Sequence, residues 1–417
     1  MSRYNQRLII NNLGPIKHCD ISLKKLTVLC GPQARGKSTI AKSIFFFRKV
    51  KNFLAEALVM PKNEPIIELE FCYTLHEKFQ QVFGSLNNLP EDMSVAFEYA
   101  PGIVIEISNW RDGKYPVRFS DNIKAWASKY FDVPLGLNDL QRVKNETEKF
   151  FRDNCETIYI PAGRSMLSIL SEALSYVFFR FTDREKSLID FCTSDYIEQV
   201  TSIKSVFTPE YRSYELLTHE DERLKQLRNK AEQILQGRYF FTKGSDYLKL
   251  NADGKEKDIG LKFASSGQQE VLWILNLIYY YASTRKPAFF IVEEPEAHLY
   301  PNTQKDIAEY VVTALSEKNE CLLTTHSPYI LGTLNNILDA RRLLDKGVDV
   351  SQIVTAENIP LLASKDEMGA YFVGDSEVVE ALDDEIGLIK NELIDDASDA
   401  INNVADKLIE AERADNE

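Results

Sequence analysis

The sequence lacks the cysteine and histidine patterns that mark disulfide-rich domains and zinc sites. Its six cysteines, at positions 19, 30, 72, 155, 192 and 321, form no CxxC pair, and its five histidines complete no metal-ligand spacing. This composition argues against a domain held together by disulfides and against a structural zinc site. We expect the cysteines to be core thiols of a protein in a reducing compartment.

Long apolar segments are also missing. No window reaches the roughly 18 uninterrupted apolar residues that a membrane-spanning helix needs, and the N-terminus lacks the apolar core of a signal peptide. With 44% hydrophobic and 27% charged residues in 417 positions, the chain can form one large core with insertions, or two domains. We therefore expect a cytoplasmic protein with no membrane segment.

Basic residues are scarce at the C-terminal end. Residues 366–417 carry 17 Asp or Glu against three Lys or Arg, which accounts for the whole net charge of −14. Residues 1–51 have the opposite bias, with 11 Lys or Arg and the single acid Asp20. This basic segment is either a solvated face or a surface for a polyanion, so the sequence leaves nucleic-acid binding open.

One segment near the N-terminus matches the phosphate-binding pattern GxxxxGK[ST] at every position. A buried-strand pattern at 26–30 precedes it and a helical pattern at 40–44 follows it, which is the context that the pattern requires. The matching residues are Gly31, Pro32, Gln33, Ala34, Arg35, Gly36, Lys37, Ser38 and Thr39. Backbone N–H groups would face the phosphates, Lys37 would reach the β- and γ-phosphates, and Ser38 would ligate Mg²⁺. We therefore predict ATP and Mg²⁺ as cofactors.

A second motif follows a continuous apolar run at 287–292, which is typical of a strand buried on both faces. Two carboxylates, Glu293 and Glu294, come directly after this run. Glu293 is predicted to hold the hydrated metal ion, and Glu294 is predicted to polarise the attacking water.

Two further motifs complete the candidate site. Ser265, Ser266 and Gly267 open an apolar helix, and a serine and a glycine at a helix N-terminus provide a second surface that can face phosphate. Another short buried strand, at 321–325, is followed at once by His326.

The order of these motifs resembles that of the ABC-type ATPases: Walker A, signature helix, Walker B and switch histidine. The segments Asn11–Ile16, Ile158–Arg164 and Glu294–Pro301 are similar to the branch that includes OLD-like and SMC-like proteins. The resemblance covers about residues 5–60, 155–170 and 235–335.

This resemblance implies an α/β fold, a P-loop NTPase core of the ABC-ATPase kind with an antiparallel β-lobe and a helical insertion. It also implies a head-to-tail dimer that holds ATP between the P-loop of one subunit and the signature of the other. Such a dimer can also be a unit of a larger assembly. Ser266 and Gly267 would then contact the partner's nucleotide. Glu294 and His326 would be the catalytic residues, His326 as the γ-phosphate switch.

The sequence departs from the family pattern at three places. Glu293 stands where the wider family has aspartate, and Gln268 replaces the second signature glycine. No glutamine follows a strand in the manner of a Q-loop, and the segment that ends in Arg164 takes that place in the chain order.

The layout predicts four parts. An ATPase lobe with the P-loop and an antiparallel subdomain, including strands near 68–73 and 95–99, spans 1–164, and a helical insertion spans 165–236. Residues 237–355 form the second ATPase lobe, which begins with a hairpin that turns at 252–254. Residues 356–417 are predicted to form an acidic helical extension.

Many OLD-like proteins carry a TOPRIM nuclease domain at this end. The acidic pairs at 383–384 and 395–396 lie in a helical pattern with no strand before them, so we expect no intrinsic nuclease.

Stand-alone ATPases of this kind resemble the ATPase subunits of anti-phage systems of the PARIS or Septu type. The sequence therefore predicts a dimeric ATPase that acts as a sensor or scaffold and controls a separate effector, such as a TOPRIM or HNH nuclease. The alternative is a DNA-repair or chromosome-maintenance ATPase of the RecF or SMC type; a transporter subunit is disfavoured by the irregular signature and the missing Q-loop.

Overall fold

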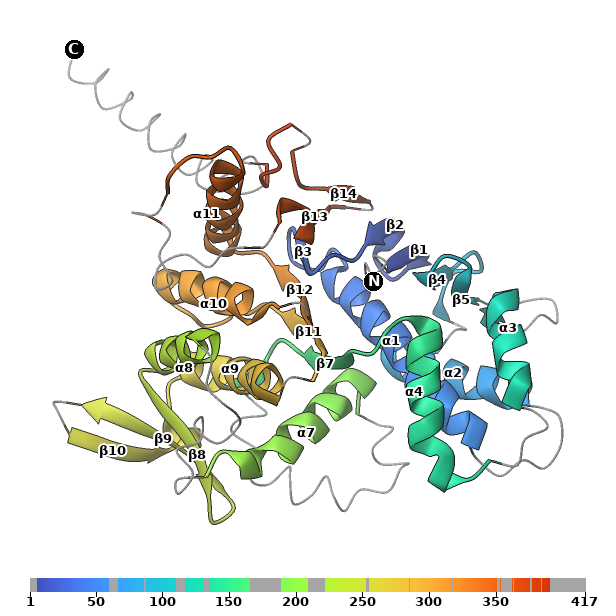
Figure 1. The fold of residues 1–417 in the computed structure, drawn as a ribbon, viewed down its shortest axis with the longest axis horizontal. Coiled ribbons are helices and arrows are strands. Elements are labelled where there is room, and N and C mark those ends of the chain that lie inside the picture. The colour runs from blue at the N-terminus through green and yellow to red at the C-terminus, as the bar shows by residue number, and fades with distance from the viewer. Residues whose placement is uncertain are drawn as a thin grey trace.

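Figure 1 shows the computed structural model of the chain. The structure describes residues 6–59, 67–85, 88–109, 117–130, 135–165, 189–208, 222–252, 255–284, 286–316, 318–350, 353, 362, 364–375, 377–383 and 385–390.

A six-stranded sheet lies at the centre of the molecule. Its order is β14-β13-β3-β12-β11-β7, and all neighbouring strands are parallel except the β13–β14 pair. The strands are β3 (Leu26–Cys30), β7 (Glu156–Ile160), β11 (Ala288–Glu293), β12 (Asn319–Thr325), β13 (Met368–Val373) and β14 (Val378–Glu380). Every residue of β3 and β11 is buried, as their continuous apolar sequences predict.

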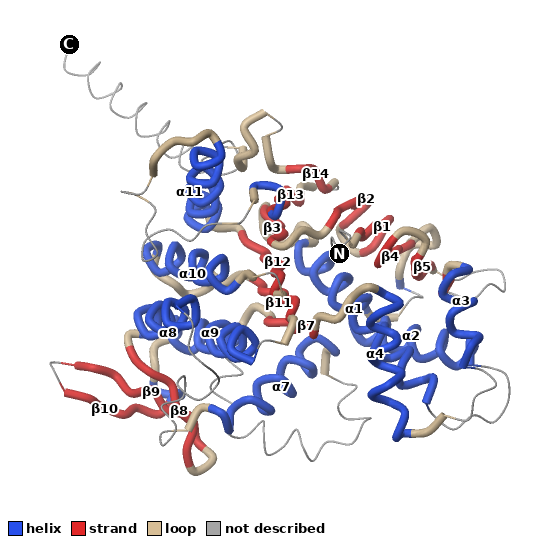
Figure 2. Tube along the Cα trace, in the orientation of Figure 1, coloured by secondary structure: helices blue, strands red, loops and turns tan. Residues whose placement is uncertain are grey.

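Helices cover both faces of this sheet (Figure 2). Alternate residues of one strand face different cores: Phe289 and Ile291 pack with α1 (Lys37–Val59), whereas Phe290 and Val292 pack with the opposite layer. That opposite layer contains α8 (Glu222–Leu235), α9 (Ser266–Thr284), α10 (Pro301–Ala314) and α11 (Pro328–Asp345). The result is a three-layer architecture, and the predicted α/β fold class is confirmed.

The antiparallel β-lobe is confirmed. Its sheet has the order β2-β1-β4-β5-β6 and lies beside the N-terminal half of α1 in Figure 1. The strands are β1 (Arg7–Leu13), β2 (Ile16–Ser22), β4 (Ser94–Ala100), β5 (Ile103–Ser108) and β6 (Val117–Phe119). Gly102, with a φ of 77°, lies in the turn between β4 and β5.

The prediction of a strand at 68–73 is wrong, because this segment lies in α2 (Ile67–Phe83). The apparent alternation is part of a helical repeat in which Phe71, Leu75 and Phe79 recur every four residues and are all buried. Phe79 packs edge-on against Phe46 of α1, with ring centroids 5.5 Å apart. Two more helices, α3 (Asp121–Ala127) and α4 (Leu140–Phe151), complete this side.

The described part of the insertion is helical. It contains α7 (Phe191–Ile203) and α8, and residues 166–188 and 209–221 lie outside the described residues. After α8 comes a three-stranded antiparallel sheet of β8 (Gly237–Thr242), β9 (Ser245–Ala252) and β10 (Lys255–Gly260). The predicted hairpin is thus β9–β10, and β8 adds a third strand.

Short 3-10 turns lie at Ser128–Tyr130, Leu137–Asp139, Lys204–Val206, Leu261–Phe263 and Lys365–Glu367.

The C-terminal part differs from the predicted helical extension. β13 joins the central sheet beside β3, and β14 folds back on it, because the apolar runs at 370–373 and 378–379 outweigh the acidic residues around them. Asp383 follows β14 in a turn, where its carboxylate accepts hydrogen bonds from the backbone N–H groups of Glu385 and Ile386. The prediction of a helix without a preceding strand is therefore wrong for Asp383. Asp384 and the pair at 395–396 lie outside the described residues.

The six cysteines are buried, as expected for core thiols. Within the residues that the structure describes, no helix is long and apolar enough to cross a membrane.

Candidate functional site

The P-loop connects β3 to α1 at the carboxyl edge of the central sheet. Gly36 has a φ of 106°, and a Cβ atom there would lie 2.4 Å from Cδ1 of Ile16, so only glycine fits. Ala34 also adopts a left-handed backbone, with a φ of 61°. Residues held in such conformations cluster at binding sites, where the surrounding structure fixes them.

Lys37 lies at the start of α1 and is buried. Its ammonium group donates hydrogen bonds of 2.8 Å to the backbone oxygens of both Gly31 and Pro32, so the loop is folded around the charge. Burial lowers the pKa of Lys37, while the nearby carboxylates of Glu294 and Glu296 act in the opposite direction. Ser38 is exposed in the first turn of the same helix. A cation and free N–H groups at a helix N-terminus suit the phosphates of a nucleotide.

The second group of residues comes from the end of β11. Glu293 is 4% exposed, and its Oε1 atom accepts no hydrogen bond from the residues that the structure describes. Its Oε2 atom accepts one from the backbone N–H of Ala162 at 3.4 Å. A buried carboxylate oxygen without a partner is costly, and Mg²⁺ prefers such oxygen ligands. Glu293 therefore fits the metal role predicted for it together with Ser38, despite the aspartate of the family pattern.

Glu294 leaves the strand with a φ of 41°. Its backbone N–H donates to both the backbone oxygen (3.0 Å) and the hydroxyl (3.2 Å) of Thr324 on β12. β12 lies between β3 and β11, so it joins the P-loop side of the site to the carboxylate side. The half-buried side chain of Glu294 is close enough to favour the charged forms of both Lys37 and His326; at Lys37 it only partly offsets the lowering of the pKa by burial, whereas the pKa of His326 is raised.

His326 follows β12 and is fixed by Glu296. Oε1 of Glu296 accepts hydrogen bonds from the Thr325 hydroxyl (2.7 Å) and the His326 backbone N–H (2.9 Å), and it lies 3.0 Å from Nδ1 of the His326 ring. The other ring nitrogen, Nε2, lies 3.3 Å from the side-chain nitrogen of Gln33 in the P-loop. The ring thus bridges the Walker B segment and the P-loop, where a γ-phosphate sensor would need to lie.

His326 and Glu296 stabilise each other's charged forms. The hydrogen bond to Glu296 raises the pKa of His326. Burial acts to raise the pKa of Glu296, but its hydrogen bonds with His326 and Thr325 outweigh burial and lower it. The stabilisation from protonated His326 is therefore complete below the ordinary histidine pKa and is lost as the pH rises through the raised value.

Glu296→Gln is expected to lower the pKa of His326, because the amide keeps the acceptor oxygen but removes the negative charge. NMR titration of the histidine rings measures this directly, and His76, whose pKa is lowered by burial, is the internal control. An unchanged His326 titration would show that Glu296 does not set its charge.

The signature segment begins α9 with a reciprocal cap. The Ser265 hydroxyl accepts from the backbone N–H of Gln268 (3.4 Å), and the Gln268 side-chain oxygen accepts from the backbone N–H of Ser265 (3.1 Å). The nitrogen of the same amide donates to the backbone oxygen of Leu235 at 2.7 Å. Gln268, which departs from the family pattern, thus anchors the helix start to the end of α8.

Gly267 and Ser266 face different surroundings. A Cβ atom on Gly267 would lie 2.9 Å from the backbone oxygen of His298, so this glycine allows α9 to pack closely on the segment after β11. Ser266 is exposed. Within the described ranges, no hydrogen bond or ion pair joins the segment 265–268 to the P-loop.

The structure therefore brings most of the predicted site together in one chain. Lys37, Glu293, Glu294 and His326 lie where the P-loop meets the ends of β11 and β12. Arg35 forms an ion pair with Asp375, just after β13, and so ties the P-loop to the last parallel strand. The signature residues Ser266 and Gly267 make no such contact with the P-loop.

The sequence matches the family described as an AAA ATPase domain over residues 6–331, more than half of the chain. The chain belongs to this family. It is an ATPase with the P-loop NTPase fold that the motifs predicted. No curated protein sequence matches it at a significant level.

Solved structures similar to this ATPase include SMC heads and an ABC cassette. An SMC head bound to the C-terminal winged-helix domain of ScpA is 14% identical, with a TM-score of 0.42 over 92% of this chain and 98% of that chain. The SMC head domain from Thermotoga maritima is 10% identical, with a TM-score of 0.39 over 91% and 98%. The ATP-binding cassette of an ABC transporter in its ADP conformation is 12% identical, with a TM-score of 0.33 over 94% and 95%.

Sequence reasoning missed two features of the ATPase site. Glu296 stands only two residues after Glu294, so its proximity could have suggested a role, but its contact with His326 depends on the pairing of β11 with β12. Arg164 was noted only for its place in the chain order. It is fully buried and contacts Glu270, Glu293 and Glu294, which are more than 100 positions away in sequence.

Proposed function

We propose that this ATPase is a nucleotide-dependent switch in which two copies bind head to tail around two ATP molecules. The observation that carries this proposal is the position of Ser266, which is exposed and makes no contact with the P-loop of its own chain. A signature serine in this position can serve the nucleotide of a second copy. Closed two-fold dimers are also the commonest assembly of soluble proteins.

In this proposal each ATP site combines two chains. One subunit supplies Lys37 for the phosphates, Ser38 and Glu293 for Mg²⁺, and Glu294 for the attacking water. The same subunit supplies His326 as γ-phosphate sensor, in contact with Gln33. The partner supplies its Ser266 and Gly267. ATP binding would close the dimer, and hydrolysis would release it.

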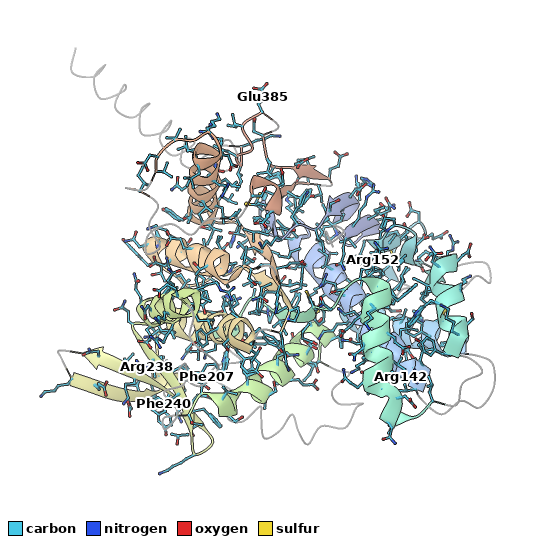
Figure 3. All side chains as sticks on the ribbon, in the orientation of Figure 1. Arg142, Arg152, Phe207, Arg238, Phe240 and Glu385 are labelled. Atoms are coloured by element: carbon cyan, nitrogen blue, oxygen red, sulfur yellow. The ribbon has the colours of Figure 1, made fainter. Side chains whose placement is uncertain are left out.

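We further propose that the switch acts on a separate protein, as the sensor or regulatory ATPase of an anti-phage system with an effector nuclease. The motifs that resemble OLD-like ATPases support this assignment. A suitable docking edge lies along β14 and the turn after it, where Val379 of β14 and Ile386 of the turn are about half exposed. Glu385 lies at the outer tip of this turn (Figure 3). Apolar side chains beside carboxylates suit a partner with a mixed apolar and basic surface.

The purified ATPase, with ATP and Mg²⁺ or Mn²⁺, is expected not to cut DNA or RNA, and duplex DNA should change its hydrolysis rate by less than about twofold. Phage restriction should require a second protein encoded nearby and should disappear when only that gene is deleted. Cleavage by the lone protein that is lost on combining Asp395→Ala with Asp396→Ala would refute the division between switch and effector. Hydrolysis strongly stimulated by DNA would instead favour the DNA-repair alternative of the RecF or SMC type.

A further inference from the structure

Arg164 is a fully buried cation that links two parts of the site. It follows β7, at the edge of the sheet beside β11, and its side chain has no exposed surface. Burying a guanidinium group is unfavourable unless its donors are satisfied, so the identity of its partners is informative.

Two of its nitrogens hold the backbone at the Walker B carboxylates. Nη1 donates to the backbone oxygens of Pro161 and Glu293, both at 2.6 Å, and Nη2 donates to the backbone oxygen of Glu294 at 3.0 Å. The guanidinium thus binds the carbonyl oxygens of two consecutive residues at the point where Glu294 adopts a left-handed backbone conformation. Together with the bonds from Glu294 to Thr324, these contacts fix the direction in which both carboxylates leave the strand.

The other partner of Arg164 is Glu270, on α9. Nε of Arg164 donates to the backbone oxygen of Glu270 at 2.9 Å and lies 3.4 Å from its carboxylate. That carboxylate also accepts hydrogen bonds from the backbone N–H groups of Arg164 (2.9 Å) and Ser165 (3.0 Å). Glu270 is itself 1% exposed and stands one helical turn after Ser266, on the same face of α9.

We propose that Arg164 is a positioning residue that couples the signature end of α9 to the Walker B carboxylates of the same subunit, and thereby couples the two ATP sites. The inference rests on the proposed head-to-tail dimer. In that dimer, Ser266 of one subunit contacts the partner's nucleotide, while Glu294 of the same subunit acts on its own nucleotide. A shift of the first turn of α9 then moves Glu270, Arg164 and the backbone at 293–294 together, because breaking this buried link would leave charges unpaired.

Arg164→Lys tests the coupling, because lysine keeps the charge but cannot hold the three carbonyl groups and Glu270 at once. We expect ATP affinity to stay within about twofold, kcat to fall about 10- to 100-fold as the carboxylates lose their alignment, and cooperativity in ATP concentration to disappear. Glu270→Gln changes the other partner of the same buried contact, on α9, and should likewise abolish cooperativity. With two variants, the test stays decisive if one of them folds poorly.

Arg48→Lys is the matched control. Arg48 is also a buried arginine, paired with Asp153 at 2.9 Å, but it packs over the Phe289 ring near the amino ends of β7 and β11, at the opposite end of these strands from the Walker B carboxylates. The alternative is that Arg164 merely stabilises the fold. In that case, an Arg48→Lys variant that loses as much thermal stability as Arg164→Lys should also lose as much of its kcat and cooperativity. Equal losses in the two variants would therefore overturn the inference.

The outcomes separate this inference from the dimer itself. A wild-type rate per subunit that depends on protein concentration and is cooperative in ATP, together with a non-cooperative Arg164→Lys variant, supports the coupling. Wild-type cooperativity that persists unchanged in Arg164→Lys overturns the coupling and leaves the dimer standing. A wild-type rate per subunit that is independent of concentration and non-cooperative overturns both.

Discussion

Glu294→Gln is expected to bind ATP as tightly as the wild-type protein and to hydrolyse it at least ~100-fold more slowly. The amide has the shape of the carboxylate, and the backbone bonds to Thr324 and Arg164 that hold residue 294 do not involve its side chain. Only the group that orients the attacking water is removed. Calorimetric titration with ATP and an assay of phosphate release measure the two effects separately.

The same variant should accumulate as a dimer in ATP and dissociate in ADP, because nucleotide held between two subunits is no longer hydrolysed. Light scattering in each nucleotide reports the mass. Glu106→Gln, on β5 of the antiparallel lobe, is the control and should hydrolyse ATP normally. Normal hydrolysis by Glu294→Gln would move the base elsewhere, with Glu293 and Glu296 the next candidates.

The parts of the fold that local patterns specify were predicted from the sequence. β3, β11 and β12 are short apolar runs that each end at a motif, and because they are parallel neighbours in one sheet, their motifs meet at one edge. The P-loop, the Walker B pair and His326 could therefore be placed together before the structure was known. The start of α9 was also predictable, since Ser265 begins a capping pattern.

The parts that depend on distant contacts could not be predicted. The segment 68–73 alternates over six residues, and only its continuation to Phe79 shows the helical repeat. β13 lies in an acidic stretch, and its place beside β3 depends on a pairing across more than 300 positions. Arg164 meets Glu270 and the Walker B backbone only after the sheet has formed, and no local pattern marks such a contact.

The central claim, that each ATP site is built from two chains, predicts a specific result when two inactive variants are combined. Lys37→Ala removes the ammonium group that the P-loop encloses, so its own P-loop should no longer bind ATP. Ser266→Arg places a bulky cation at the exposed start of α9, where it should block the site whose P-loop belongs to the partner. Each variant alone should be inactive for a different reason.

A heterodimer of the two variants has one site with both defects and one site with none. The decisive measurement is ATP hydrolysis by heterodimers isolated through two different affinity tags. We expect recovery of up to about half of the wild-type rate, since one of two sites is intact. Heterodimers no more active than either variant alone would contradict the account and show that each site is complete within one chain.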